Sequence, residues 1–249
     1  MVFDNPFAGS INKSKDLYYA DLVATIAEQH HREEIATKIR RNYEFRYRIS
    51  RLLETHLCNW RKDIKILVQS NISAYYALVP STANFNERIT HLKTSSSYIY
   101  PGDIMTSINK SAPYQNRIFA NITRYFLFRQ NHQTVSTLMS YFAINHPDGV
   151  KHAIPSPFIA LVATAIYAGI LDLELKSKRS LPFETDFYLD TYMSHIGTLQ
   201  ALKSQYPTLY SKITEELYTN AIIGIPFTLE NQNQGVQNIL DGMDLEGQD

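Results

Sequence analysis

The sequence predicts an all-α fold: a single compact domain of many helices around a central apolar helix. Residues 158–171 are apolar with almost no interruption, follow two prolines, and show no period-two alternation. This pattern is typical of a buried helix. Between Ile49 and Leu78, apolar residues recur at three- and four-residue steps until Pro80. That spacing indicates one long amphipathic helix.

Composition limits the possible functions. The chain has 249 residues, 44% of them hydrophobic, enough to bury a large core. Its 24 basic and 24 acidic residues cancel, so no overall field draws it to nucleic acid or to an anionic membrane. The longest apolar run, 14 residues, is shorter than the roughly 20 that span a bilayer. With no secretory start, we expect an intracellular protein, nuclear or cytoplasmic, without a membrane partner.

The chain divides by composition into three parts. We expect a flexible N-terminus over residues 1–13, a helical domain over 14–227 and a disordered acidic tail over 228–249, because residues 230–249 hold five acidic and no basic residues. Ser14 is suited to cap the first helix. The apolar stripe of that helix comprises Tyr19, Leu22, Val23 and Ile26. The stripe of the long helix comprises Ile49, Leu53, Leu57, Trp60, Ile64, Leu67, Ala74 or Tyr75, and Leu78. We expect Cys58, within it, to be a buried thiol.

The middle of the chain has weaker patterns. Residues 80–113 favour a structured loop region with a short helix over 86–92 and a turn at Pro101 and Gly102. Two helices are predicted next, over residues 114–130 and 135–143. The HPDG stretch at 146–149 then has the residue types of a turn.

Two further helices follow the central one. The first begins near Thr185 as N-cap, and its stripe comprises Tyr188, Tyr192, His195, Leu199 and Leu202. Tyr206 and Pro207 break that helix, and Pro207 is tolerated in the first turn of the next. The inner face of that last helix comprises Leu209, Ile213 and Leu217.

Three blocks of sequence carry a resemblance to a known family. IPSPFIALVATAIYAGI, FYLDTYMSHIGTL and YPTLYSKITEELY resemble the C-terminal signature of a domain family of unknown function found mainly in mushroom-forming (basidiomycete) fungi. The resemblance extends over about residues 51–220. It implies a compact helical domain and supplies no activity and no catalytic residue. The resemblance also implies membership of a family that often appears in expanded sets near mobile elements, and this context points only weakly to nucleic-acid biology.

Motifs for catalysis, metals and cofactors are missing. The four residues His30, His31, Glu33 and Glu34 lie close in sequence but lack the HExxH arrangement and a third ligand, so no metal site is predicted. GxSxG, GxGxxG and the P-loop pattern do not occur, and we therefore predict no catalytic residues and no cofactor. His195 could act as a general base among tyrosines, although a hydrogen-bonded core histidine is the more common arrangement.

Basic residues concentrate between residues 30 and 51, where seven Lys or Arg stand against three Glu, with aromatic residues among them. Cations beside aromatic rings are typical of surfaces that contact phosphates and bases. The candidate nucleic-acid-binding residues are Lys38, Arg40, Arg41, Tyr43, Arg46, Arg48 and Arg51, joined by Arg117 and Arg124 on a second helix.

Three functional hypotheses remain from the sequence. In the first, the protein is a non-enzymatic intracellular binding module that contacts DNA or RNA through the basic segment. In the second, it is an assembly protein that binds itself, as a homo-oligomer, or another protein, and the same arginines pair with Glu and Asp. The third and least favoured hypothesis is an enzyme of unfamiliar type, with a pocket among tyrosines and His195. A solvated helix face competes with every binding role of the segment, because the net charge is zero.

Overall fold

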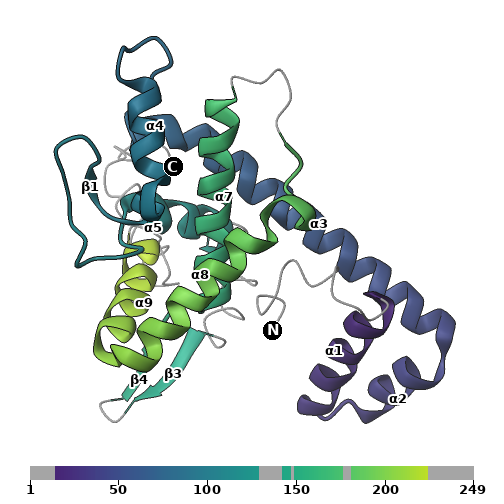
Figure 1. The fold of residues 1–249 in the computed structure, drawn as a ribbon. Helices are drawn as coiled ribbons and strands as arrows, with labels where there is room; N and C mark the ends of the chain where they lie inside the picture. Colours follow the sequence, from purple (N-terminus) through teal and green to yellow (C-terminus); the bar gives the residue numbers. More distant parts are fainter. Residues whose placement is uncertain (1–14, 129–141, 147–148, 176–180, 224–249) are drawn as a thin grey trace, which may run out of the picture.

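The computed structural model describes residues 15–128, 142–146, 149–175 and 181–223. The predicted flexible N-terminus over 1–13, the predicted acidic tail over 228–249 and the Ser14 cap lie outside the described residues. Most of the helix predicted over 135–143 also lies outside them, and Ala143 is the first residue of a strand, not the end of a helix. The remaining chain is mainly α-helical, as predicted (Figure 1).

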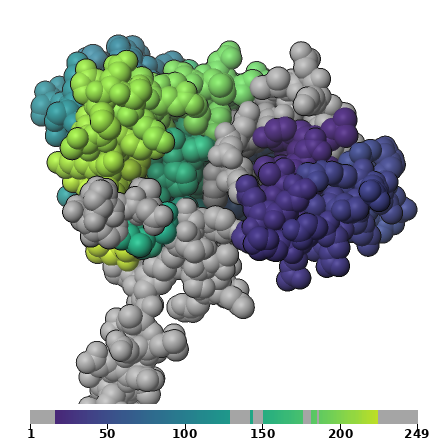
Figure 2. Space-filling view, turned by 90° about the horizontal axis from the view of Figure 1, so that it is seen from below, coloured from purple at the N-terminus to yellow at the C-terminus, as the bar shows by residue number. Residues whose placement is uncertain are grey.

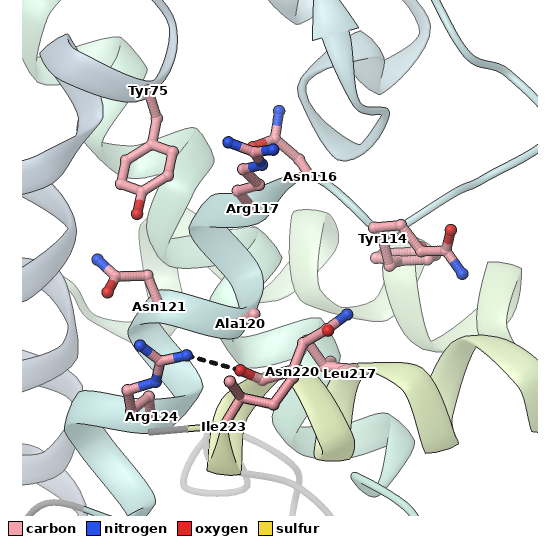
Figure 3. A pocket seen from close by; sticks show the side chains of 11 residues that line it. Tyr75, Tyr114, Asn116, Arg117, Ala120, Asn121, Arg124, Leu217, Asn220 and Ile223 are labelled. Carbon is pink, nitrogen blue, oxygen red and sulfur yellow. Dashed lines mark hydrogen bonds between the residues drawn. The ribbon is translucent and has the colours of Figure 1, made fainter. Parts of the chain in front are cut away.

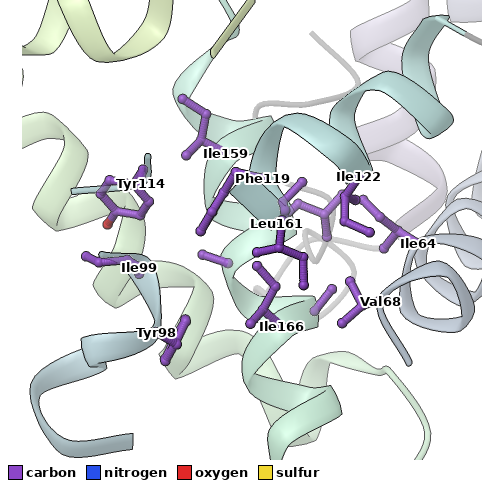
Figure 4. Packing of buried hydrophobic residues seen from close by; sticks show 14 of the residues in the cluster. Ile64, Val68, Tyr98, Ile99, Tyr114, Phe119, Ile122, Ile159, Leu161 and Ile166 are labelled. Carbon is purple, nitrogen blue, oxygen red and sulfur yellow. The ribbon is translucent and has the colours of Figure 1, made fainter. Parts of the chain in front are cut away.

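The central helix, α7, spans Ser156–Glu174 and confirms the prediction for residues 158–171. It begins after Pro155, with a proline in its first turn, where a missing N–H costs nothing. Helices α3 (Tyr43–Tyr75) and α8 (Thr185–Gln205) pack against it. Figure 4 shows Leu161 and Ile166 of α7 between Val68 of α3 and Tyr98, which lies in another segment of the core. The apolar run is therefore enclosed on several sides.

α7 is also the one described helix that is long and apolar enough to cross a membrane. However, 67% of its most apolar stretch is buried inside the protein, as in a core helix.

The long helix, α3, spans Tyr43–Tyr75, six residues earlier at its start than the predicted stripe and ending before Pro80. It starts early because the Asn42 side chain caps it, accepting a hydrogen bond from the backbone N–H of Phe45 at 3.0 Å. Its buried apolar residues are Leu57, Ile64, Val68 and Ile72. Trp60 and Leu67, expected in the core, are only partly buried. Cys58 is exposed, which corrects the expectation of a buried thiol.

The segment between α3 and α7 contains short elements. Helix α4 (Phe85–Lys93) confirms the helix predicted over 86–92, and a 3₁₀ helix (Thr94–Ile99) follows it. The helix predicted over 114–130 starts only at Arg117, as α5 (Arg117–Thr123), and continues as a π-helix, η3 (Arg124–Phe128). Two antiparallel hairpins complete the segment: β1 (Gly102–Asp103) with β2 (Ser107–Ile108), and β3 (Ala143–His146) with β4 (Gly149–His152).

Both predicted turns coincide with these hairpins. Gly102 has a φ of +114°, and a Cβ there would collide with the Ser107 carbonyl oxygen, so the first hairpin requires glycine. In the second, His146 pairs with Gly149, at the two ends of the HPDG stretch; its middle residues, 147–148, lie outside the described residues.

Two helices after α7 complete the main body. Helix α8 spans Thr185–Gln205, and its N-cap is Glu184, so Thr185 is the first helical residue and not the cap. Its predicted stripe is buried at Tyr188, Tyr192, His195 and Leu199. Helix α9 spans Pro207–Ile222 and buries Ile213 and Leu217, as predicted.

At the other end of the molecule, α1 (Lys15–Gln29), α2 (Glu33–Arg41) and the first half of α3 pack together. We call this part the N-terminal lobe. A small hydrophobic cluster, separate from the main core, holds the lobe together and consists of Ala20, Ala24, Ala27, Ala36 and Ile39. Of the stripe predicted for α1, only Tyr19 is buried. Figures 1 and 2 show the lobe standing to one side of α8 and α9.

Candidate functional site

The basic segment lies on the N-terminal lobe. Lys38, Arg40 and Arg41 occupy the last turn of α2, where positive charge is favoured by the helix dipole. Asn42 alone separates α2 from α3, so the first turns of α3 follow directly with Tyr43, Arg46, Arg48 and Arg51. The structure thus brings all seven predicted residues of the segment to one lobe.

Three arginines of the segment form ion pairs within the chain. Arg40 binds Glu28 of α1, with Nη2 donating to Oε2 at 3.0 Å, and this hydrogen bond lowers the pKa of Glu28. The other two pairs are Arg48 with Glu44 at 2.5 Å and Arg51 with Glu54 at 2.8 Å. Water reaches all three pairs and screens their charges, so they contribute little to stability. Such pairs orient the arginine side chains, and another anion can replace the glutamate as the partner.

The remaining residues of the segment contact aromatic rings or face solvent. The Arg46 guanidinium carbon lies 5.4 Å from the centre of the Tyr43 ring, and Tyr43 stacks on Tyr47 with centroids 6.5 Å apart. Tyr43 is 69% exposed and Tyr47 is 43% exposed. Lys38 Nζ lies 4.6 Å from the centre of the Phe45 ring. Arg41 is exposed and, within the described part of the chain, has no acidic partner.

Arg117 and Arg124 lie elsewhere, on α5 and η3 in the main body (Figure 1). Arg124 donates from Nε to the carbonyl oxygen of Ala221 at 3.0 Å and from Nη2 to that of Asn220 at 2.8 Å. It therefore caps the C-terminal end of α9. The two arginines line a pocket of their own (Figure 3) and do not extend the basic surface of the lobe.

His195 belongs to the core. Its Nε2 lies 2.6 Å from the Tyr98 hydroxyl, and its Nδ1 lies 3.1 Å from the Tyr114 hydroxyl. Burial lowers the pKa of His195 to about 4, so the ring is neutral near pH 7. The side chain is only 3% exposed, and both ring nitrogens have hydrogen-bond partners. This arrangement is typical of a core histidine, because a general base must reach its substrate.

Acidic, histidine and cysteine side chains do not gather into a metal site in the described ranges: no group of three or more is placed to hold an ion.

No curated protein and no solved structure matches the chain significantly. A family model does match, over residues 1–202, so it includes the N-terminal lobe and α7 but ends before α9. The match begins further toward the N-terminus than the resemblance over about 51–220 suggested, and the YPTLYSKITEELY block lies beyond it. The chain is thus a member of the family described as a domain of unknown function (DUF6532).

Proposed function

We propose that the protein is a non-enzymatic intracellular binding module whose N-terminal lobe binds single-stranded nucleic acid. The observation that carries this proposal is the exposed stack of Tyr43 and Tyr47 with Arg46 against it. An exposed aromatic pair offers a face on which bases stack, worth about 1–3 kcal/mol per base.

The charges around this stack suit a phosphate backbone. Arg41 faces solvent, and Arg48 is held only by an exposed pair with Glu44. A phosphate oxygen can replace a carboxylate as the acceptor of an arginine, because both accept charge-assisted hydrogen bonds. Contact with phosphate therefore costs the lobe little, and the lobe stands to one side of the main body (Figure 2).

The test is a fluorescence anisotropy titration with random-sequence single-stranded DNA and RNA, and with duplexes of each, at several salt concentrations. If four cations contact phosphates, the logarithm of the binding constant should fall against log salt with a slope of about −3. Arg41→Gln should reduce that slope by about 0.7. Tyr43→Ala should weaken binding about tenfold with the slope unchanged, because stacking releases no counterions.

Matched controls lie on the main body. Tyr206 is 59% exposed at the junction of α8 and α9, and Lys212 is exposed on α9. Tyr206→Ala removes an exposed aromatic ring and Lys212→Gln removes an exposed positive charge, both outside the lobe. Both variants should bind nucleic acid as the wild type does. Equal losses in lobe and control variants, or no binding at low salt, would refute the proposal.

A second function is favoured by the ion pairs themselves. Arg40, Arg48 and Arg51 each pair with a glutamate of the same chain, as the assembly hypothesis expects. In that case, light scattering should report a defined oligomer, and no nucleic acid should bind even at low salt. Glu44→Lys would then change the oligomer's mass, whereas it would strengthen nucleic-acid binding under the first proposal.

A further inference from the structure

A polar cavity of about 380 Å³ opens in the main body, between the end of α3, α5 and α9 (Figure 3). Its volume falls within the range of small-molecule sites. The floor is the face of α5 that carries Ala120, with Tyr75 on one wall and Leu217 on the other. None of its described lining residues is acidic, whereas two of them are arginines.

The two arginines stand at opposite ends of this pocket. Arg117 and Arg124 are seven residues apart, which is about 10 Å along a helix, and both project from the same face. Within the described ranges, no carboxylate pairs with Arg117, which is exposed at the rim. The partners of Arg124 are carbonyl oxygens, which fix the guanidinium without neutralising it. Two positive charges therefore face one hollow.

Neutral donors complete the lining. Figure 3 shows the Tyr75 hydroxyl and the Asn121 side chain on the same side of the pocket as Arg124. The Asn121 amide makes one long hydrogen bond, to Asn71 at 3.3 Å, and can reorient toward a ligand. One acidic side chain, Glu216, contacts a residue of the lining: it accepts a hydrogen bond from the Gln115 amide at 2.6 Å and lies 3.8 Å from Lys212 Nζ. That carboxylate already has partners.

We infer that this pocket binds a small molecule that carries an oxyanion, either a phosphate or a carboxylate group. Arg117 and Arg124 supply charge-assisted hydrogen bonds to the oxyanion, and the Asn121 amide and the Tyr75 hydroxyl orient it. Leu217 and Ile223 contact the apolar remainder of the ligand. The site is independent of the nucleic-acid surface proposed for the lobe, because the two share no residue.

Isothermal titration with inorganic phosphate and with succinate, at constant ionic strength set with chloride, tests the inference on the full chain. Phosphate stabilises many proteins merely by exclusion from their surface, so the decisive measurement is the heat of saturable binding. Arg117→Gln should weaken binding about tenfold or more, the usual effect of one charge-assisted hydrogen bond. Lys203→Gln removes an exposed positive charge from α8, outside both the pocket and the lobe, and should leave binding within about twofold of wild type.

Ala120→Leu provides a second variant, because it fills the floor of the pocket while keeping both arginines. It should abolish binding of either probe. The tighter of the two probes identifies the natural oxyanion as phosphate or carboxylate. No saturable binding of either probe at tens of millimolar would overturn the inference, as would wild-type binding by Arg117→Gln. Arg117→Gln should still bind nucleic acid, so failure of one proposal leaves the other intact.

Discussion

The hydroxyl of Tyr98 lies 2.6 Å from Nε2 of His195, deep between the 3₁₀ helix and α8. Tyr114 occupies the other ring nitrogen of the histidine, and the Tyr76 hydroxyl donates to the Tyr98 carbonyl oxygen at 2.8 Å. A neutral imidazole has one donor and one acceptor nitrogen, so one tyrosine must donate to His195 and the other must accept. This network joins segments from both halves of the chain inside an apolar core.

The first prediction concerns the pH dependence of stability. Burial lowers the pKa of His195 to about 4 from the ordinary 6.5. The unfolded chain therefore binds a proton at a higher pH than the folded chain, and protons favour unfolding. The contribution of His195 to the free energy of unfolding should be constant above about pH 6.5. It should fall by on the order of 3 kcal/mol in total as the pH drops from 6.5 to 4. Urea unfolding measured across this pH range checks the slope.

His195→Gln is the control for that slope. Glutamine keeps a donor and an acceptor but does not titrate, so the variant should lose less stability between pH 6.5 and 4 than the wild type loses. An identical slope in both proteins would show that folding does not lower the pKa of His195 and that other groups cause the acid sensitivity.

The second prediction compares two buried tyrosines. The Tyr188 hydroxyl has no hydrogen-bond partner among the described residues, and burial raises the pKa of Tyr188 to about 12. Tyr188→Phe removes a hydroxyl that is buried at a desolvation cost and makes no hydrogen bond in return, so it should stabilise the protein by about 1 kcal/mol. Tyr114→Phe instead leaves Nδ1 of His195 without its partner and should destabilise it by about 1–3 kcal/mol.

Thermal melts of the two phenylalanine variants, run side by side, distinguish these effects. Both changes delete one oxygen from a buried ring, so a difference in sign reports the hydrogen bonding alone. Equal destabilisation by the two variants would mean that Tyr188 has a partner.

Periodicity predicted the elements whose buried face is continuous and apolar. The stripes of α8 and α9 could be read from spacing, because each of these helices has one dominant apolar face. The central helix α7 could be predicted from its unbroken apolar run, because it is buried on nearly every side. In α3 the same method chose Leu67 over Val68, since both are apolar and adjacent. Which of the two is buried depends on the side of α3 on which α7 packs. The spacing of residues along α3 alone does not give that side.

Small and charged residues caused the other differences. The lobe is built on alanines, which hydrophobic periodicity weighs too little to detect, although they let α1 and α2 approach closely. The sequence joins Arg124 to the candidate nucleic-acid surface, but in the structure it lies in the main body and donates to carbonyl groups almost a hundred residues away. The pocket that it lines depends on that long-range pairing, so no local motif could have indicated it.

The third prediction concerns a buried ion pair between the long and central helices. Lys65 Nζ lies 2.8 Å from Asp172 Oδ2, and both side chains are at most 10% exposed. Asp172 also accepts from the Gln69 amide at 2.7 Å. Lys65→Met leaves a buried carboxylate without its cation and should destabilise the protein by about 3–5 kcal/mol.

Lys93 and Glu174 form a comparable pair between α4 and α7 that is more exposed, at 29% and 37% of the two side chains. Lys93→Met should therefore cost no more than about 1 kcal/mol, because water can solvate the remaining carboxylate. Denaturant midpoints of the two methionine variants give the comparison. A smaller loss for Lys65→Met than for Lys93→Met would contradict the burial of the first pair.

The last prediction tests how closely α3 and α7 approach. A Cβ added at Gly169 of α7 would lie 3.0 Å from Ile72 Cδ1 and 3.1 Å from Val68 Cγ1, both on α3. Gly169→Ala should destabilise the protein by up to about 2 kcal/mol, because overpacking, at about 1–3 kcal/mol, outweighs the roughly 1 kcal/mol that alanine gains in helix propensity. Gly197 of α8 has no atom within 4 Å of the same position, so Gly197→Ala should raise stability by about 0.5–1 kcal/mol. Since the two substitutions are chemically identical and both lie inside helices, opposite shifts in melting temperature would isolate the α3–α7 contact, whereas two increases would place the helices further apart.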